Sequence, residues 1–155
     1  MLNNDVLRSL RYTLNISDST LLEMLHGAEP ELDLATLRSY LASEEDESFI
    51  RMEDELMVGF LDNLIVSRRG PSPQAAPATE LPLTNNTILK KLRVAFTLQE
   101  ADLIDILDSV DFDVTKPELS ALFRKAGHNN YRLCGDQLLR QFLKGLTLRF
   151  RLEAN

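Results

Sequence analysis

The chain repeats itself at a spacing of 82 residues. Shifted by that distance, residues 3–69 align with residues 85–151 without a gap, and 14 of the 67 aligned pairs are identical. Composition alone would give about 5 identities, so the match indicates a diverged internal duplication. Eight of the identical pairs are Leu, and the six informative ones are Asn3/Asn85, Asn4/Asn86, Arg11/Arg93, Asp54/Asp136, Phe60/Phe142 and Arg69/Arg151.

Between the two copies lies a segment that has no counterpart. Residues 70–84, with the sequence GPSPQAAPATELPLT, hold four of the six prolines of the chain. Such a Pro/Ala-rich composition favours an extended, solvated spacer. The sequence therefore predicts a first repeat at residues 1–69, a linker at 70–84 and a second repeat at 85–155.

Within each repeat, apolar residues recur at helical spacing in four segments, and no segment alternates as a strand would. We expect the asparagine pairs to cap the first helix, and the third to begin near Asp33 or Thr115. Capping boxes are expected at Thr97–Glu100 and Thr115–Glu118. The fourth helix should bury Leu56, Phe60, Leu61 and Leu64, or Leu138, Phe142, Leu143 and Leu146. The prediction is an all-α fold of two tandem four-helix repeats related by a pseudo-two-fold axis. Because a unit of about 70 residues is marginal alone, we expect the two repeats to pack against each other.

Several classes of protein are disfavoured by what the chain lacks. Its first residues resemble no secretory signal, and no apolar run reaches the roughly 18 residues of a membrane span, so we expect a cytoplasmic protein without membrane contact. The single cysteine, Cys134, is expected to be structural. Because no Gly-rich phosphate loop, Cys/His metal spacing or nucleophile motif occurs, the prediction is a chain that is not an enzyme and has no cofactor and no metal.

The charge of −7 is unevenly distributed. Residues 1–69 carry a net charge of −8, residues 85–155 carry +2, and residues 114–151 alone carry +6. A negative chain gains little from counterion release, which argues against indiscriminate binding to nucleic acid or to anionic membranes. The C-terminal quarter offers the only basic surface.

The repeated Asn-Asn motifs and the late segment Cys134-Gly135-Asp136-Gln137-Leu138-Leu139-Arg140 resemble the YehS-like family of short bacterial proteins. The resemblance covers the whole chain, including the duplication and the variable linker. It implies a bacterial cytosolic protein, and it implies no activity, cofactor or site residue.

The sharpest constellation of polar residues is one that both copies keep. An amide, a guanidinium and a carboxylate at one mouth of each bundle could hold a polar or anionic ligand. In the structural alternative, which we favour, the asparagines and aspartates sit at helix N-termini and each arginine pairs with its aspartate. The candidate polar site consists of Asn4, Arg11, Asp54, Asn86, Arg93 and Asp136.

A second candidate is a basic surface on the second repeat. It could bind nucleic acid, with Tyr131 as the one plausible stacking residue. Alternatively, it could dock on the acidic run Glu44–Glu47, which lies one repeat length from residues 126–129, either within the chain or between subunits. Its members are Lys90, Lys91, Arg124, Lys125, Arg132, Arg140 and Lys144.

The overall expectation is a non-catalytic protein-binding or adaptor module, with a protein partner or a homo-oligomer. The alternative is a nucleic-acid-associated protein that uses the basic second repeat. A small-ligand sensor built on the two polar trios is a third possibility.

Overall fold

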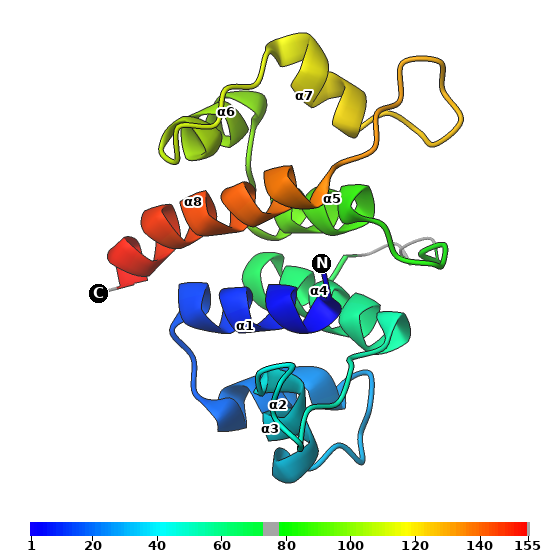
Figure 1. The fold of residues 1–155 in the computed structure, drawn as a ribbon, viewed down its shortest axis with the longest axis vertical. Helices are drawn as coiled ribbons and strands as arrows, with labels where there is room; N and C mark the ends of the chain where they lie inside the picture. Colours follow the sequence, from blue (N-terminus) through cyan, green and yellow to red (C-terminus); the bar gives the residue numbers. More distant parts are fainter. Residues whose placement is uncertain (73–77, 155) are drawn as a thin grey trace.

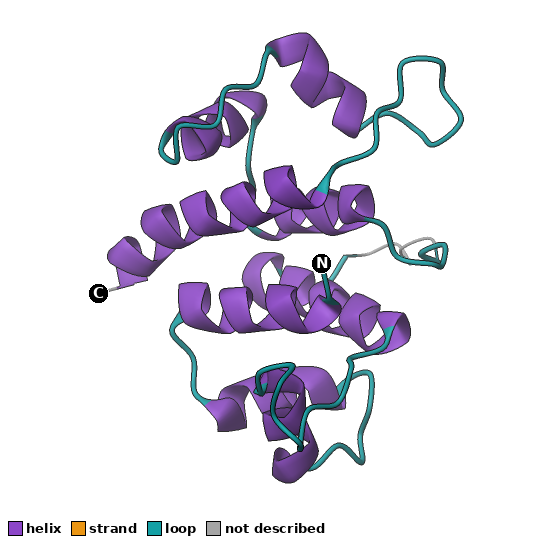
Figure 2. Cartoon of the chain, viewed as in Figure 1, coloured by secondary structure: helices purple, strands orange, loops and turns teal. Residues whose placement is uncertain are grey.

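The computed structural model describes residues 1–72 and 78–154, with side chains up to residue 151. Over those ranges the chain forms eight helices and no strand (Figures 1 and 2). The first repeat contains α1 (Asn3–Leu14), α2 (Asp18–His26), α3 (Leu34–Leu41) and α4 (Asp54–Arg69). The second contains α5 (Asn85–Ala95), α6 (Glu100–Asp108), α7 (Lys116–Leu122) and α8 (Asp136–Ala154).

The long first and fourth helices of both repeats form the middle of the molecule. Here α1 packs along α8 and α4 packs along α5, while α2 with α3 and α6 with α7 cover the two ends (Figure 1). Since α5 is the copy of α1 and α8 is the copy of α4, the α1–α8 and α4–α5 contacts are equivalent. The predicted tandem four-helix repeats and their pseudo-two-fold relation are confirmed.

A single apolar core runs through both repeats. The predicted fourth-helix residues are buried except Leu138, which is half-buried, and both Phe60 and Phe142 are fully enclosed. At the junction, the hydroxyls of Thr13 on α1 and Thr147 on α8 lie 2.6 Å apart. Because the central helices bury apolar surface against the other repeat, neither repeat is closed without its partner.

Helix caps follow the expectation only in part. The box of Thr115 and Glu118 forms as predicted, and Asp33 caps α3. The cap predicted for the asparagine pairs is wrong, since Leu2 and Thr84 precede α1 and α5.

The predicted Thr97–Glu100 box is also wrong. Gln99 precedes α6 and shares its capping box with Asp102. Thr97 instead belongs to the turn that ends α5, where it takes a left-handed φ of 54°, as its counterpart Asn15 does with φ 53°.

The predicted linker is described only in part, because residues 73–77 lie outside the described part of the chain. At its C-terminal end, Thr84 caps α5 and the Leu83 amide bonds to Asp54, so these two residues are tied to the repeats rather than extended and solvated. Among the helices of the described ranges, none is long and apolar enough to span a bilayer.

Candidate functional site

The repeated asparagines Asn4 and Asn86 are buried clamps for a loop. In each repeat the side-chain amide donates two hydrogen bonds to main-chain oxygens that flank the loop after the third helix, and its oxygen accepts one from a main-chain N–H. The partners are Tyr40 O (2.9 Å), Ile50 O (2.8 Å) and Met52 N (2.9 Å) for Asn4, and Leu122 O (3.0 Å), Arg132 O (2.8 Å) and Cys134 N (2.8 Å) for Asn86. Both N–H groups and one acceptor position of each buried amide are therefore occupied by the protein itself.

The repeated aspartates begin α4 and α8 and join the two repeats. Asp54 accepts from Asn3 of its own repeat (2.8 Å) and from the Leu83 amide of the other (2.9 Å). Asp136 accepts in the same way from Asn85 (2.8 Å) and from the amino group of Met1 (2.7 Å). These two bonds, the one from the N-terminal amine first, lower the pKa of Asp136 below its usual value.

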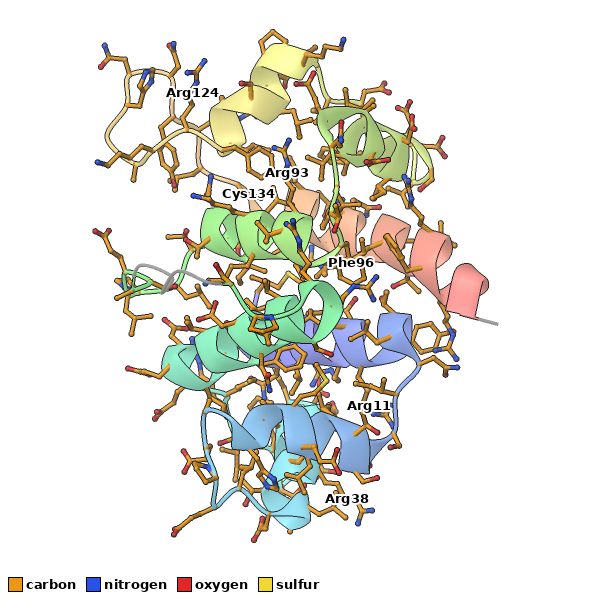
Figure 3. The ribbon with its side chains drawn as sticks, turned by 180° about the vertical axis from the view of Figure 1, so that it is seen from behind. Arg11, Arg38, Arg93, Phe96, Arg124 and Cys134 are labelled. Carbon is orange, nitrogen blue, oxygen red and sulfur yellow. The ribbon has the colours of Figure 1, made fainter. Side chains whose placement is uncertain are left out.

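The repeated arginines lie away from these aspartates, so the predicted trios do not assemble. Arg11 sits near the far end of α1, where its Nε is 2.8 Å from Asp18, and Arg93 donates to Leu98 O (3.0 Å) and lies 4.7 Å from the centre of the Phe123 ring (Figure 3). Seven residues of helix, about 10 Å, separate Arg11 from Asn4 along α1. The pairing of each arginine with its aspartate is therefore wrong.

The last polar identity, Arg69/Arg151, also serves the junction of the repeats. Arg69 donates to Val94 O (3.5 Å), and Arg151 donates to the equivalent Tyr12 O while its guanidinium stands 3.8 Å over the Tyr12 ring. Both arginines thus satisfy a carbonyl at the C-terminus of the other repeat's first helix. Among the described residues, no buried side-chain polar atom lacks a hydrogen-bond partner.

Cys134, the one cysteine of the chain, is buried. Burial raises the pKa of the Cys134 thiol to about 11, and the charge of Asp136 adds to this. A thiol with such a pKa is protonated at neutral pH and is a poor nucleophile. Within the part of the chain that the structure describes, no three His, Cys, Asp or Glu side chains are grouped to hold a metal ion.

The predicted basic surface divides into separate groups. Lys91 is nearly buried and pairs with Asp62 across the junction, whereas Lys90 is exposed on α5. Arg140 and Lys144 lie on α8 beside an open hollow that also contains Met1 and Asp5. The remaining members, Arg124, Lys125 and Arg132, belong to the loop between α7 and α8.

That loop, residues 124–133, has the same pattern of main-chain hydrogen bonds as its counterpart, residues 42–51, although Gly127 takes a left-handed φ of 95° that its counterpart Glu45 does not share. Four hydrogen bonds recur at the same positions, in addition to those of the asparagine clamps. They are Asp46 N to Ser43 O, Phe49 N to Asp46 O, Ile50 N to Ser39 O and Ser48 N to Asp46 Oδ1 in the first repeat, and His128 N to Lys125 O, Tyr131 N to His128 O, Arg132 N to Ala121 O and Asn130 N to His128 Nδ1 in the second. The two loops are therefore one structural element that occurs twice.

The charges of the two loops are opposite. Residues 42–51 hold four carboxylates and one arginine, a net charge of −3, whereas residues 124–133 hold two arginines, one lysine and no carboxylate, a net charge of +3. We call them the acidic loop and the basic loop. They lie in different repeats on either side of the central helices (Figure 1), so the acidic run does not dock on the basic set within the chain as one alternative expected. The repeats meet through α1, α4, α5 and α8 instead.

The basic loop and α7 border an open hollow of about 600 Å³. On its rim, Arg132 pairs with Glu118 (3.0 Å), and the bonds of Glu118 to Thr115 and then to Arg132 lower the pKa of that carboxyl. Arg124, labelled in Figure 3, also lines this hollow, and neither it nor Lys125 pairs with a carboxylate among the described residues. In the same loop, Tyr131 is half-buried and Leu133 is 70% exposed. Sequence analysis found these basic residues but not Leu133, which no pattern distinguishes from a core leucine.

Fold and surface together define a class: an all-α tandem-repeat protein whose two units share one frame and differ in the charge of one loop. The chain belongs to the family described as protein of unknown function (DUF1456), which matches residues 3–70 and 85–151. It is similar to the uncharacterized protein YehS of Escherichia coli (strain K12), with 41% identity over 151 residues that cover 96% of each chain. No solved structure matches the chain.

Proposed function

We propose that this chain is a non-catalytic protein-binding module of the bacterial cytoplasm, and that the basic loop is its contact surface for an acidic segment of a partner. The observation that carries the proposal is that Arg124 and Lys125 are exposed without a carboxylate partner among the described residues, in the same loop as the exposed Leu133. Cations and an exposed aliphatic side chain in one loop suit a protein interface, in which an apolar contact is flanked by charge pairs.

Nucleic acid is the second candidate for the same surface, because Tyr131 lines the same hollow as Arg124 and Arg132 and could stack on a base. The number of available charges favours a protein. The basic loop has three cations, of which Arg132 already pairs with Glu118, and the other basic groups lie elsewhere. If three phosphates are neutralised, the logarithm of the binding constant falls with the logarithm of the salt concentration with a slope of about −2.7. So few phosphate contacts give weak binding, and the net charge of −7 on the whole chain opposes it further.

Affinity capture from the native cell with three baits tests the proposal. The wild type is compared with R124E/K125E, which reverses the free charges of the basic loop, and with K90E/K144E, which makes the same change in net charge elsewhere on the second repeat. We expect proteins that the wild type and K90E/K144E retain and that R124E/K125E loses. Identical protein sets on all three baits would refute the proposal, and absorbance of nucleic acid in the eluate, lost only with R124E/K125E, would favour the second candidate.

A further inference from the structure

We infer that the acidic segment taken by the basic loop is the acidic loop of a second copy of this chain, so that molecules associate head to tail. This inference rests on the proposed function and names the partner. It starts from the equivalence of the two loops, which share their turns and their asparagine clamps but carry net charges of −3 and +3.

The charges that would form this contact are free to do so. Glu44 and Glu47 of the acidic loop are exposed, and they pair with no cation among the described residues, which also holds for Arg124 and Lys125. The other two carboxylates of the run are held by hydroxyls: Ser43 and Ser48 bond to Glu45 and Asp46 respectively, and these bonds lower the pKa of both carboxyls.

Each loop also presents one exposed aliphatic side chain next to its charges. Ile50 of the acidic loop is 44% exposed, and Leu133 of the basic loop is 70% exposed. In the sequence, Ile50 stands between the four carboxylates of residues 44–47 and Arg51, and Leu133 directly follows Arg132, so the two side chains belong to loops of opposite net charge. An apolar pair surrounded by opposite charges is the arrangement of a small, specific interface.

The position of the loops determines the kind of assembly. An acidic loop bound to a basic loop is a heterologous contact, which leaves one acidic and one basic loop unoccupied in every pair. Further copies add at these free ends, so association continues into chains or closes into a ring rather than stopping at a dimer. Because the charges are at the surface, salt weakens the contact.

Sedimentation velocity at low and high salt tests this, at protein concentrations up to about 1 mM because a small surface gives weak association. We expect the mean mass to rise with concentration at low salt and to return to the monomer at about 1 M salt. A wild type that remains monomeric at low salt overturns the inference. Loss of captured partners on R124E/K125E would still support the proposed function in that case, so the two failures are distinguishable.

Charge reversal identifies the surface. E44K/E47K changes the acidic loop from −3 to +1, and R124E/K125E changes the basic loop from +3 to −1, without removing any side chain that bonds within its loop. Each variant alone then has two ends of like sign and should be monomeric, whereas an equimolar mixture should form heterodimers through its two unaltered loops. K90E/K144E should associate like the wild type. Association that persists in either single variant, or a mixture that stays monomeric while the wild type associates, overturns the inference, with circular dichroism establishing that each variant is folded.

Discussion

Replacement of Asn4 by alanine distinguishes a structural clamp from a ligand-binding residue. The side chain is fully buried and makes three hydrogen bonds of 2.8 to 2.9 Å with main-chain groups on both sides of the acidic loop. Alanine removes all three and leaves two carbonyl oxygens and one N–H of the loop without that partner. At about 1 kcal/mol or more for each such group, we expect the free energy of unfolding to fall by about 3 to 5 kcal/mol.

Urea unfolding followed by the helical circular dichroism signal measures this change. The copy provides an internal replicate, since Asn86→Ala removes the same three bonds in the second repeat. Asn3→Ala is the milder control, because that side chain makes two bonds in a less buried place, and we expect a loss of about 1 to 2 kcal/mol.

The structural assignment would be refuted if Asn4→Ala unfolded within about 0.5 kcal/mol of the wild type, as a surface substitution does. Polar groups held in place for a ligand are commonly neutral or costly for stability, so their removal tends to leave it unchanged or to raise it. A stable Asn4→Ala protein would therefore return the asparagines to the list of candidate ligand-binding residues.

Four further predictions concern single positions. Thr97→Asn should stabilise the fold by about 1 kcal/mol in thermal unfolding, because a β-branched residue there takes the left-handed φ that asparagine accepts at the equivalent Asn15. Gly145→Ala should destabilise it by about 1 to 3 kcal/mol, since a Cβ at this position would lie 2.4 Å from a main-chain oxygen of α6. Cys134 should resist iodoacetamide at pH 8 until the protein is unfolded, because a thiol with a pKa of about 11 is ionised to only about one part in a thousand. The lowered pKa of Asp136 means that its contribution to stability is present above the unfolded value of about 3.9 and is lost as the pH falls through the folded pKa, so Asp136→Asn should reduce the loss of stability seen in acid titrations.

The helices and the duplication were predictable because both have strong signals in the sequence. Each helix carries its apolar residues on one face, and the alignment of the copies strengthens every assignment. Helix starts were predicted less well. The asparagine pair satisfies the local rule for a cap, but its bonds reach a loop 36 to 48 residues away, and no local pattern reports such a partner.

Compensating differences between the repeats were also beyond sequence reasoning. In the first repeat, Asn63 donates to a carbonyl near the end of α2 (2.5 Å), and Gly27 lies against that amide. In the second, the position of Asn63 is taken by Gly145 and that of Gly27 by Ser109, whose hydroxyl donates to the equivalent carbonyl of α6 (2.6 Å). In the alignment these are two unrelated mismatches. In the structure, the equivalent carbonyl accepts a hydrogen bond from the fourth helix in the first repeat and from the end of the second helix in the second repeat.

The candidate sites also depended on partners that are distant in the sequence. The repeated polar residues proved to hold the frame: the asparagines fix the loops, the aspartates join the repeats, and Arg69 and Arg151 satisfy helix ends. Identity between copies was therefore a guide to architecture. The charge difference between residues 44–47 and 126–129 was visible in the alignment, but its meaning required the shared hydrogen-bond pattern of the two loops.

That shared pattern constrains how a partner could tell the two ends of the molecule apart. The loops share their hydrogen-bond pattern and their clamps and differ locally at Gly127, whose φ of 95° has no counterpart at Glu45, so the difference that extends over the whole loop is one of charge. Their charges of −3 and +3 differ by six units, and like charges brought together at an interface are strongly disfavoured. Selection between the ends is then electrostatic, and because the charges lie at the surface, salt should reduce the preference for one end over the other.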